Sequence, residues 1–215
     1  MNHKENQGRT ALFEATENQN RKMIRLLAEE LNADLNVPNI DGKTPMMRAA
    51  EMSEIEVLKS LRELGADMNE RNKCDEGKTL LHQVVSREKS EQQLKVLEFL
   101  GAGPRKPNPN MQDESVFKSY PIHIAVLTNN MGAADVLVKQ LGAHLDVQDA
   151  QGRTPFFLAV ELGNILGRAL VECTYKCTGG VGVQWAVVVG GSRANRSEAN
   201  LAPQRPQSVS SSSRV

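Results

Sequence analysis

The amino-acid sequence predicts an all-α solenoid of stacked helix–turn–helix units, with four complete units, a partial fifth and a disordered C-terminal tail. The prediction rests on two sequence signatures that share one period and alternate along the chain. It also rests on composition, because Leu, Ala and Val are common while the 215 residues include only one Trp, two Tyr and five Phe. Small side chains suit closely packed helices better than an aromatic-rich sheet.

The first signature is Gly-x-Thr followed by Pro or an apolar residue, and its copies begin at Gly8, Gly42, Gly77 and Gly152, with a worn copy at Ser119-Tyr120-Pro121. The threonines, with Tyr120 in the fourth place, are spaced 34, 35, 41 and 34 residues apart. The second signature, Asn or Gly followed by Ala, falls between them at Asn32, Gly65, Gly101 and Gly142. Two interleaved signatures at one period indicate a repeated structural unit.

The first helix of each unit is expected to begin just after the threonine. A threonine hydroxyl can accept the free N–H groups of a first helical turn, which places the N-caps at Thr10, Thr44, Thr79 and Thr154. Proline follows at the first helical position, where its missing N–H costs nothing, at Pro45, Pro121 and Pro155. Small residues then allow close approach to the next unit, at Ala15, Ala49-Ala50, Val84-Val85, Ala125-Val126 and Ala159-Val160.

The second helix of each unit is expected to be amphipathic, because its apolar residues follow a 3.6-residue period. The stretches are Met23-Ile24-Leu26-Leu27, Ile55-Val57-Leu58-Leu61, Leu94-Val96-Leu97-Leu100 and Val136-Leu137-Leu141. A left-handed residue should end each of these helices, a conformation that Gly and, next best, Asn adopt cheaply. The expected positions are Asn32, Gly65, Gly101 and Gly142.

These residues together resemble the ankyrin repeat, whose pattern Gly-x-Thr-Pro-Leu-His-x-Ala-Ala … Gly-Ala-Asp-x-Asn matches residues 39–71 without a gap. The resemblance implies an ankyrin-repeat array over residues 1–164. The repeats are expected at about 5–38, 39–71, 74–104 and 116–148, with a partial repeat at 149–164.

The third unit departs from the pattern in two places. A polar run, residues 86–93, replaces the usual tight turn between the helices, and the loop at 103–118 is long and contains Pro104, Pro107 and Pro109. Stiff, extended loops of this kind often carry function, although a surface insertion also costs little stability. Both interpretations of the 103–118 segment stay open.

The C-terminal region departs more sharply, because Gly167 and Arg168 stand where a second helix should be apolar. Residues 165–215, which end in a Ser-rich low-complexity stretch, are expected to be an irregular or disordered tail. A truncated or alternatively ended form of a longer protein would explain this, and so would a degenerate cap followed by a natural tail.

Candidate reactive residues do not form a recognisable active site, and neither a cofactor nor a metal is expected. Cys173 and Cys177 lack the further ligands that zinc requires. His82 and His123 occupy the Leu-His position of the repeat, which implies a structural hydrogen bond rather than catalysis. The prediction is therefore a non-enzymatic protein.

Charge and cysteine content indicate the cellular compartment and the classes of partner. The chain has 26 basic and 26 acidic residues, which gives no global field for nucleic acid or a membrane surface, and three cysteines are too few for a disulfide framework. No apolar stretch approaches the length of a spanning helix. We expect a monomer in the cytoplasm, or also in the nucleus, that binds neither nucleic acid nor membrane.

The resemblance implies a scaffold or adaptor that binds one partner protein through loop tips and a concave face. The positions that vary in such repeats are the candidate partner-binding residues. They are Asn6, Gln7, Arg9, Glu17 and Asn18; Ile40, Asp41, Lys43, Glu51 and Met52; Asp75, Glu76, Lys78, Ser86 and Arg87; Leu127 and Thr128; and Ala150, Gln151, Arg153, Glu161 and Leu162.

Two alternative functions stay open. Residues 122–128 and 158–161 are similar to stretches in the ankyrin inhibitors of Rel-type transcription factors, which implies a regulator of such factors. The array could also be the targeting fragment of a larger ankyrin protein, including an enzyme.

Overall fold

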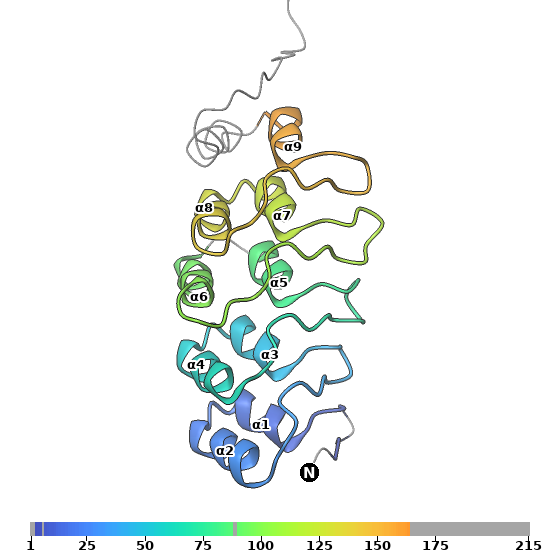
Figure 1. Ribbon diagram of the computed structural model, residues 1–215. Helices are drawn as coiled ribbons and strands as arrows, with labels where there is room; N and C mark the ends of the chain where they lie inside the picture. Colours follow the sequence, from blue (N-terminus) through green and yellow to red (C-terminus); the bar gives the residue numbers. More distant parts are fainter. Residues whose placement is uncertain (1–2, 6, 88–89, 164–215) are drawn as a thin grey trace, which may run out of the picture. The chain divides into compact units, whose positions relative to one another are not determined.

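The computed structural model describes residues 3–5, 7–87 and 90–163 (Figure 1). The predicted tail, the cysteines at 173 and 177, and Asn6 lie outside these residues. All described residues belong to one compact unit.

The described residues form four helix pairs and the first helix of a fifth unit. The first pair is α1 (Ala11–Glu17) and α2 (Arg21–Arg25), which continues into a π-helical turn, η1 (Leu26–Glu30). The others are α3 (Pro45–Glu51) with α4 (Ile55–Leu64), α5 (Leu80–Ser86) with α6 (Glu91–Gly101), and α7 (Pro121–Leu127) with α8 (Met131–Lys139). The last helix is α9 (Pro155–Glu161). The predicted all-α repeat architecture is confirmed.

The first helices begin where local chemistry predicts. The hydroxyls of Thr10, Thr44 and Thr154 accept the N–H of the residue three places on, at 3.2–3.3 Å. Thr79 forms a capping box with His82 instead, and α3, α7 and α9 each begin at a proline. Capping of this kind stabilises a short helix by about 1 kcal/mol.

The second helices end at left-handed residues in three of the four predicted places: Asn32 has φ 49°, Gly65 has φ 97° and Gly142 has φ 78°. The prediction for Gly101 is wrong. Gly101 is the last residue of α6, and the left-handed residue is Gly103, with φ 92°. Gly101 serves close packing, because a Cβ there would lie 2.6 Å from the side-chain oxygen of Gln140.

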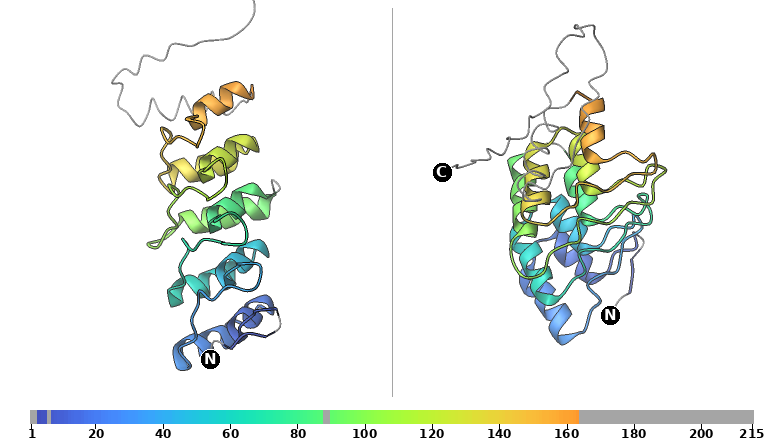
Figure 2. Two further views of the ribbon diagram at one scale, coloured as in Figure 1. Left: turned by 90° about the vertical axis from the view of Figure 1, so that its right-hand side faces the viewer. Right: turned by 45° about the horizontal axis from the view of Figure 1, so that its top comes forward.

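Figure 1 shows the first helices stacked in one column, the second helices in a neighbouring column, and the long loops projecting together on the side of the first helices. Figure 2 shows the same stack from two further directions. The core lies between the columns and includes fully buried Ile24, Leu58, Leu97 and Leu137, one from each second helix. In the first unit, Met23 and Leu26 are about 40% exposed, although both fit the predicted apolar stretch.

The extra residues of the third unit follow α6 on the side of the second helices. Arg62 donates from Nη1 to the carbonyls of Phe99 (3.0 Å) and Ala102 (2.7 Å), and its guanidinium lies 3.9 Å from the centre of the Phe99 ring. On the other side, Lys106 donates to the carbonyl of Gln140 at 2.8 Å. The part of the chain from Phe99 to Lys106 therefore bridges the second and fourth units.

Candidate partner-binding face

Each unit projects a loop that we call a finger. A backbone N–H to carbonyl bond closes each finger at its base, and the five pairs are Glu5–Arg9, Asn39–Lys43, Asn72–Lys78, Asp113–Ser119 and Asp149–Arg153, which define fingers 1 to 5. In fingers 2 to 5 the side-chain oxygen of the first residue also accepts N–H groups of the turn. The finger bases are thus held by local hydrogen bonds.

Backbone bonds join neighbouring fingers. The N–H of Ile40 donates to Gln7 (3.2 Å), that of Glu114 to Glu76 (2.6 Å) and that of Ala150 to Phe117 (2.8 Å). These bonds join finger 1 to finger 2, finger 3 to finger 4 and finger 4 to finger 5, and between fingers 2 and 3 the Sγ of Cys74 donates to the carbonyl of Ile40 at 3.4 Å.

Two buried histidines connect the helices to the next finger. Nδ1 of His82 accepts the N–H of Thr79 (3.2 Å), so it carries no proton, and Nε2 lies 3.0 Å from the carbonyl of Ser119, to which its proton is donated. His123 repeats this arrangement with Tyr120 and the carbonyl of Arg153. Burial lowers the pKa of both histidines below the ordinary value of 6.5. The expectation of a structural role agrees with these bonds.

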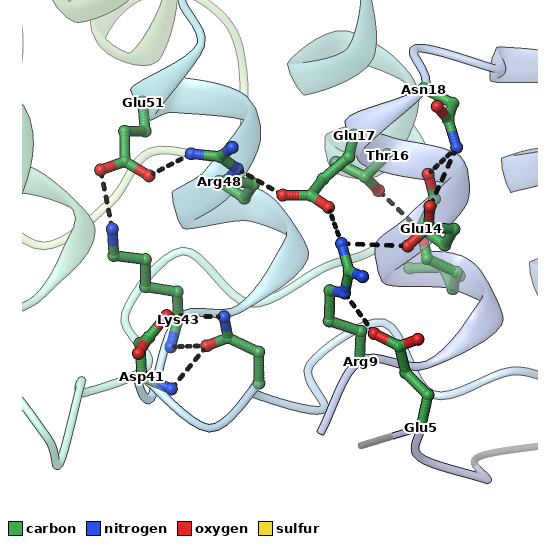
Figure 3. A network of polar contacts seen from close by, with 12 residues as sticks. Glu5, Arg9, Glu14, Thr16, Glu17, Asn18, Asp41, Lys43, Arg48 and Glu51 are labelled. Atoms are coloured by element: carbon green, nitrogen blue, oxygen red, sulfur yellow. Dashed lines mark hydrogen bonds and ion pairs between the residues drawn. The ribbon is translucent and has the colours of Figure 1, made fainter. Parts of the chain in front are cut away.

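A ladder of ion pairs crosses the first two units (Figure 3). Glu17 accepts from Arg9 (2.6 Å) and Arg48 (2.8 Å), and Glu51 accepts from Arg48 (2.9 Å) and Lys43 (2.7 Å). We call these five residues the charged ladder. Burial alone would raise the pKa of Glu51, but its bonds to Lys43 and Arg48 outweigh this and lower it. The ladder fixes the charged side chains of this face relative to one another.

The structure places the predicted site residues in two classes. The first class forms ion pairs within the chain: Arg9, Lys43 and Glu51 in the ladder, Lys78 with Asp75 (2.7 Å) and Glu76 (3.6 Å), and Arg153 with Asp149 (2.9 Å) and Glu161 (3.6 Å). The second class is exposed without such a pair in the described chain, and comprises Gln7, Ile40, Asp41, Arg87, Leu127, Gln151 and Leu162. Met52 and Thr128 are half-buried.

Five of the predicted residues come together in one groove between α3 and α5. The groove has a volume of about 280 Å³ and is lined by Lys43, Met47, Glu51, Asp75, Gln83, Val84, Ser86 and Arg87. It opens because Ser86, a small residue, stands in α5 at the place that Glu51 holds in α3. A second hollow of about 450 Å³ shares Val84, Ser86 and Arg87 with it.

Arg87 differs from the other cations of the groove. Its guanidinium donates to the backbone carbonyl of Glu51, and it forms no ion pair with a described residue. An Arg side chain carries five N–H donors. Arg87 therefore keeps N–H groups that can donate hydrogen bonds to an acidic group of a partner. The groove thus offers an available cation, while Met47 and Val84 line its floor and are only 2% and 3% exposed.

Val116 and Phe117, at the tip of finger 4, were missed by the sequence analysis. They are 87% and 50% exposed. The available signal was an apolar pair within a polar loop. Both residues fall within the 103–118 segment, and the spacing of the repeats does not show where the finger tip lies in it.

The described residues hold no group of three or more His, Cys, Asp or Glu side chains that could bind a metal. No helix among them is long and apolar enough to cross a membrane.

Family models agree with the repeat geometry. A model of ankyrin repeats in three copies matches residues 1–72, and a model of ankyrin repeats in many copies matches residues 46–100. The chain is an ankyrin-repeat protein. Its repeats belong to a family of protein–protein interaction modules, which is the general function that the sequence predicts.

Two curated relatives extend the comparison. The chain is 27% identical to NF-kappa-B inhibitor alpha of Rattus norvegicus over 158 residues, which cover 73% of this chain and 47% of the relative. It is 27% identical to NF-kappa-B inhibitor alpha of Mus musculus over 129 residues, which cover 60% of this chain and 38% of the relative. The chain therefore spans less than half the length of the curated relatives that it matches.

Proposed function

We propose that this ankyrin-repeat protein is a non-enzymatic scaffold or adaptor that holds one partner protein in the groove between α3 and α5. The observation that carries the proposal is the meeting of Lys43, Glu51, Asp75 and Arg87, from two successive units, around one hollow. A surface assembled from two units is available only in the folded stack. We expect the module to act as a monomer in the cytoplasm or nucleus.

The chemistry of the groove favours a protein segment over nucleic acid. Binding of nucleic acid depends on free cations that neutralise phosphates, whereas Lys43, Arg48 and Lys78 already pair with carboxylates. An extended peptide segment in the groove would place an acidic side chain against Arg87 and would meet only the small exposed parts of the apolar Met47 and Val84. Mixed polar and apolar contacts of this kind are typical of protein interfaces.

The test is affinity capture with the full chain, followed by measurement of the dissociation constant for the purified partner. Arg87→Glu should weaken binding by about tenfold or more, because it reverses the charge that faces the groove. Lys59→Glu is the matched control, since it reverses an exposed charge on α4, and it should change affinity less than about twofold. Equal effects of the two substitutions would contradict the proposal.

Regulation of NF-kappa-B is a second candidate function, favoured by the similarity to NF-kappa-B inhibitor alpha over 158 residues. Calorimetry with the purified full chain and a purified NF-kappa-B dimer tests it directly. Saturable binding that Arg87→Glu weakens would support both proposals together. An absence of binding heat at micromolar concentrations would remove this candidate and leave the scaffold proposal standing.

A further inference from the structure

The tip of finger 4 presents an apolar pair to solvent. Val116 is 87% exposed and Phe117 is 50% exposed, and they are the only sequence neighbours among the large exposed apolar residues of the described chain. Phe117 is an aromatic residue, and aromatic side chains are enriched among the few residues that contribute most of an interface's binding energy.

The backbone of this tip is fixed by bonds that do not involve the side chains of Val116 or Phe117. The buried carboxylate of Asp113 accepts the N–H of Ser119 (2.8 Å) and the hydroxyl of Ser115 (2.7 Å). The N–H of Phe117 in turn donates to Oγ of Ser115 at 3.2 Å. A loop that is already ordered loses less conformational entropy when it binds.

Neighbouring fingers hold the tip on both sides. The N–H of Glu114 donates to the carbonyl of Glu76 in finger 3 at 2.6 Å, and the carbonyl of Phe117 accepts the N–H of Ala150 in finger 5 at 2.8 Å. The loop that carries the apolar pair is therefore hydrogen-bonded to the fingers on both sides and is not isolated.

The flank toward finger 3 is acidic. The side chains of Glu76 and Glu114 are 59% and 60% exposed, and their nearest cations are Lys78 at 3.6 Å and Arg71 at 3.9 Å. These pairs are longer than hydrogen-bonding distance, so both carboxylates keep acceptor sites. On the other flank, Lys118 is exposed and adds one positive charge.

We propose that Val116 and Phe117 form an anchor that inserts into an apolar pocket of a folded partner protein, and that the rim of this pocket is basic where it meets Glu76 and Glu114. The anchor is a contact surface beyond the groove between α3 and α5. Insertion would bury the two apolar side chains, and the basic rim would pair with the two carboxylates.

The experiment selects binders from a phage-displayed library of a fibronectin type III domain with randomised loops, against the immobilised full chain. Such selections favour surfaces that can supply the most binding energy. Each clone is then measured by biolayer interferometry against the double variant Val116→Ser/Phe117→Ser. The matched control, Leu31→Ser/Met131→Ser, removes two apolar side chains that are each 38% exposed elsewhere on the chain.

We expect the largest group of clones to lose about tenfold affinity or more on the tip variant and less than about twofold on the control. These clones should carry net positive randomised loops and lose affinity several-fold on Glu76→Gln/Glu114→Gln. Phe117→Leu should retain binding, since it keeps an apolar side chain. Circular dichroism of each variant checks that the helices are intact, and the single variant Phe117→Ser serves if the double variant does not fold.

Two results would overturn the inference. Clones that bind the tip variant within twofold of the parent chain would show that Val116 and Phe117 are not an anchor. Clones that depend on the tip but bind the Glu76→Gln/Glu114→Gln variant with unchanged affinity would show that the rim of the partner's pocket is not basic. Neither result bears on the groove, which Arg87→Glu tests separately.

Discussion

Replacing His82 with phenylalanine removes one bond between the third and fourth units and one bond within the third unit. The substitution keeps a buried aromatic side chain, as Phe13 shows at the equivalent position of the first unit, where it is 1% exposed. It removes the Nε2–H donor to the carbonyl of Ser119 and the Nδ1 acceptor of the Thr79 N–H.

The expected cost follows from what each partner retains. The carbonyl of Ser119 still accepts the N–H of Asp113 at 2.9 Å, so its loss is that of one ordinary bond, about 1 kcal/mol. Thr79 is only 2% exposed, so its N–H would be left buried without an acceptor. An unsatisfied buried N–H costs about 1–3 kcal/mol. His82→Phe should therefore lower the free energy of unfolding by about 2–4 kcal/mol.

Urea unfolding followed by far-UV circular dichroism measures this change, and hydrogen exchange at the amide of Thr79 reports it locally. The amide of Phe13 is the internal control, because the first unit does not contact His82 and its protection should change least. A loss of less than about 0.5 kcal/mol, or equal loss of protection in both units, would refute the assignment of these two stabilising bonds to His82.

Three further predictions address other parts of the stack. Lowering the pH from about 7.5 to about 5.5 should reduce stability, because the pKa values of His82 and His123 are lowered in the folded state, so that below about 6.5 the unfolded chain binds more protons. Urea midpoints against pH measure this, and His82→Phe should flatten the profile. Arg48→Met should cost about 1 kcal/mol, since its ladder contacts are partly exposed, and the cost measured by urea unfolding should shrink in about 1 M salt. Gly103→Ala should lower the thermal midpoint through about 1 kcal/mol of left-handed strain, and Gly103→Asn should lower it less; equal midpoints for these two variants would contradict the strain argument.

The sequence predicted those features that depend on local chemistry. Thr10, Thr44 and Thr154 cap their helices because the hydroxyl of each accepts a free N–H of the first turn, three residues further on. This bond depends only on neighbouring residues. The left-handed residue of the third unit was misplaced, because Gly101 fits the Gly-Ala signature whereas Gly103, which Pro104 follows, does not. Gly101 packs instead against Gln140, the residue that follows α8, and this contact between units is not contained in the local pattern.

The charged ladder and the groove could not be read from spacing alone. Arg48 reaches Glu17 across 31 residues, and this contact exists only once two units stack in register. The repeat pattern describes one unit at a time, so it contains neither the pairing of side chains between units nor the hollow beside Ser86. The exposure of Val116 depends likewise on how finger 4 lies against its neighbours.

The central claim is that a partner protein binds on the side of the fingers and first helices. Hydrogen–deuterium exchange of the full chain, with and without the purified partner, tests this most directly. We expect added protection in fingers 2 to 4 and at the C-terminal end of α5, with little change in α2, α4, α6 and α8. Protection confined to those second helices would contradict it.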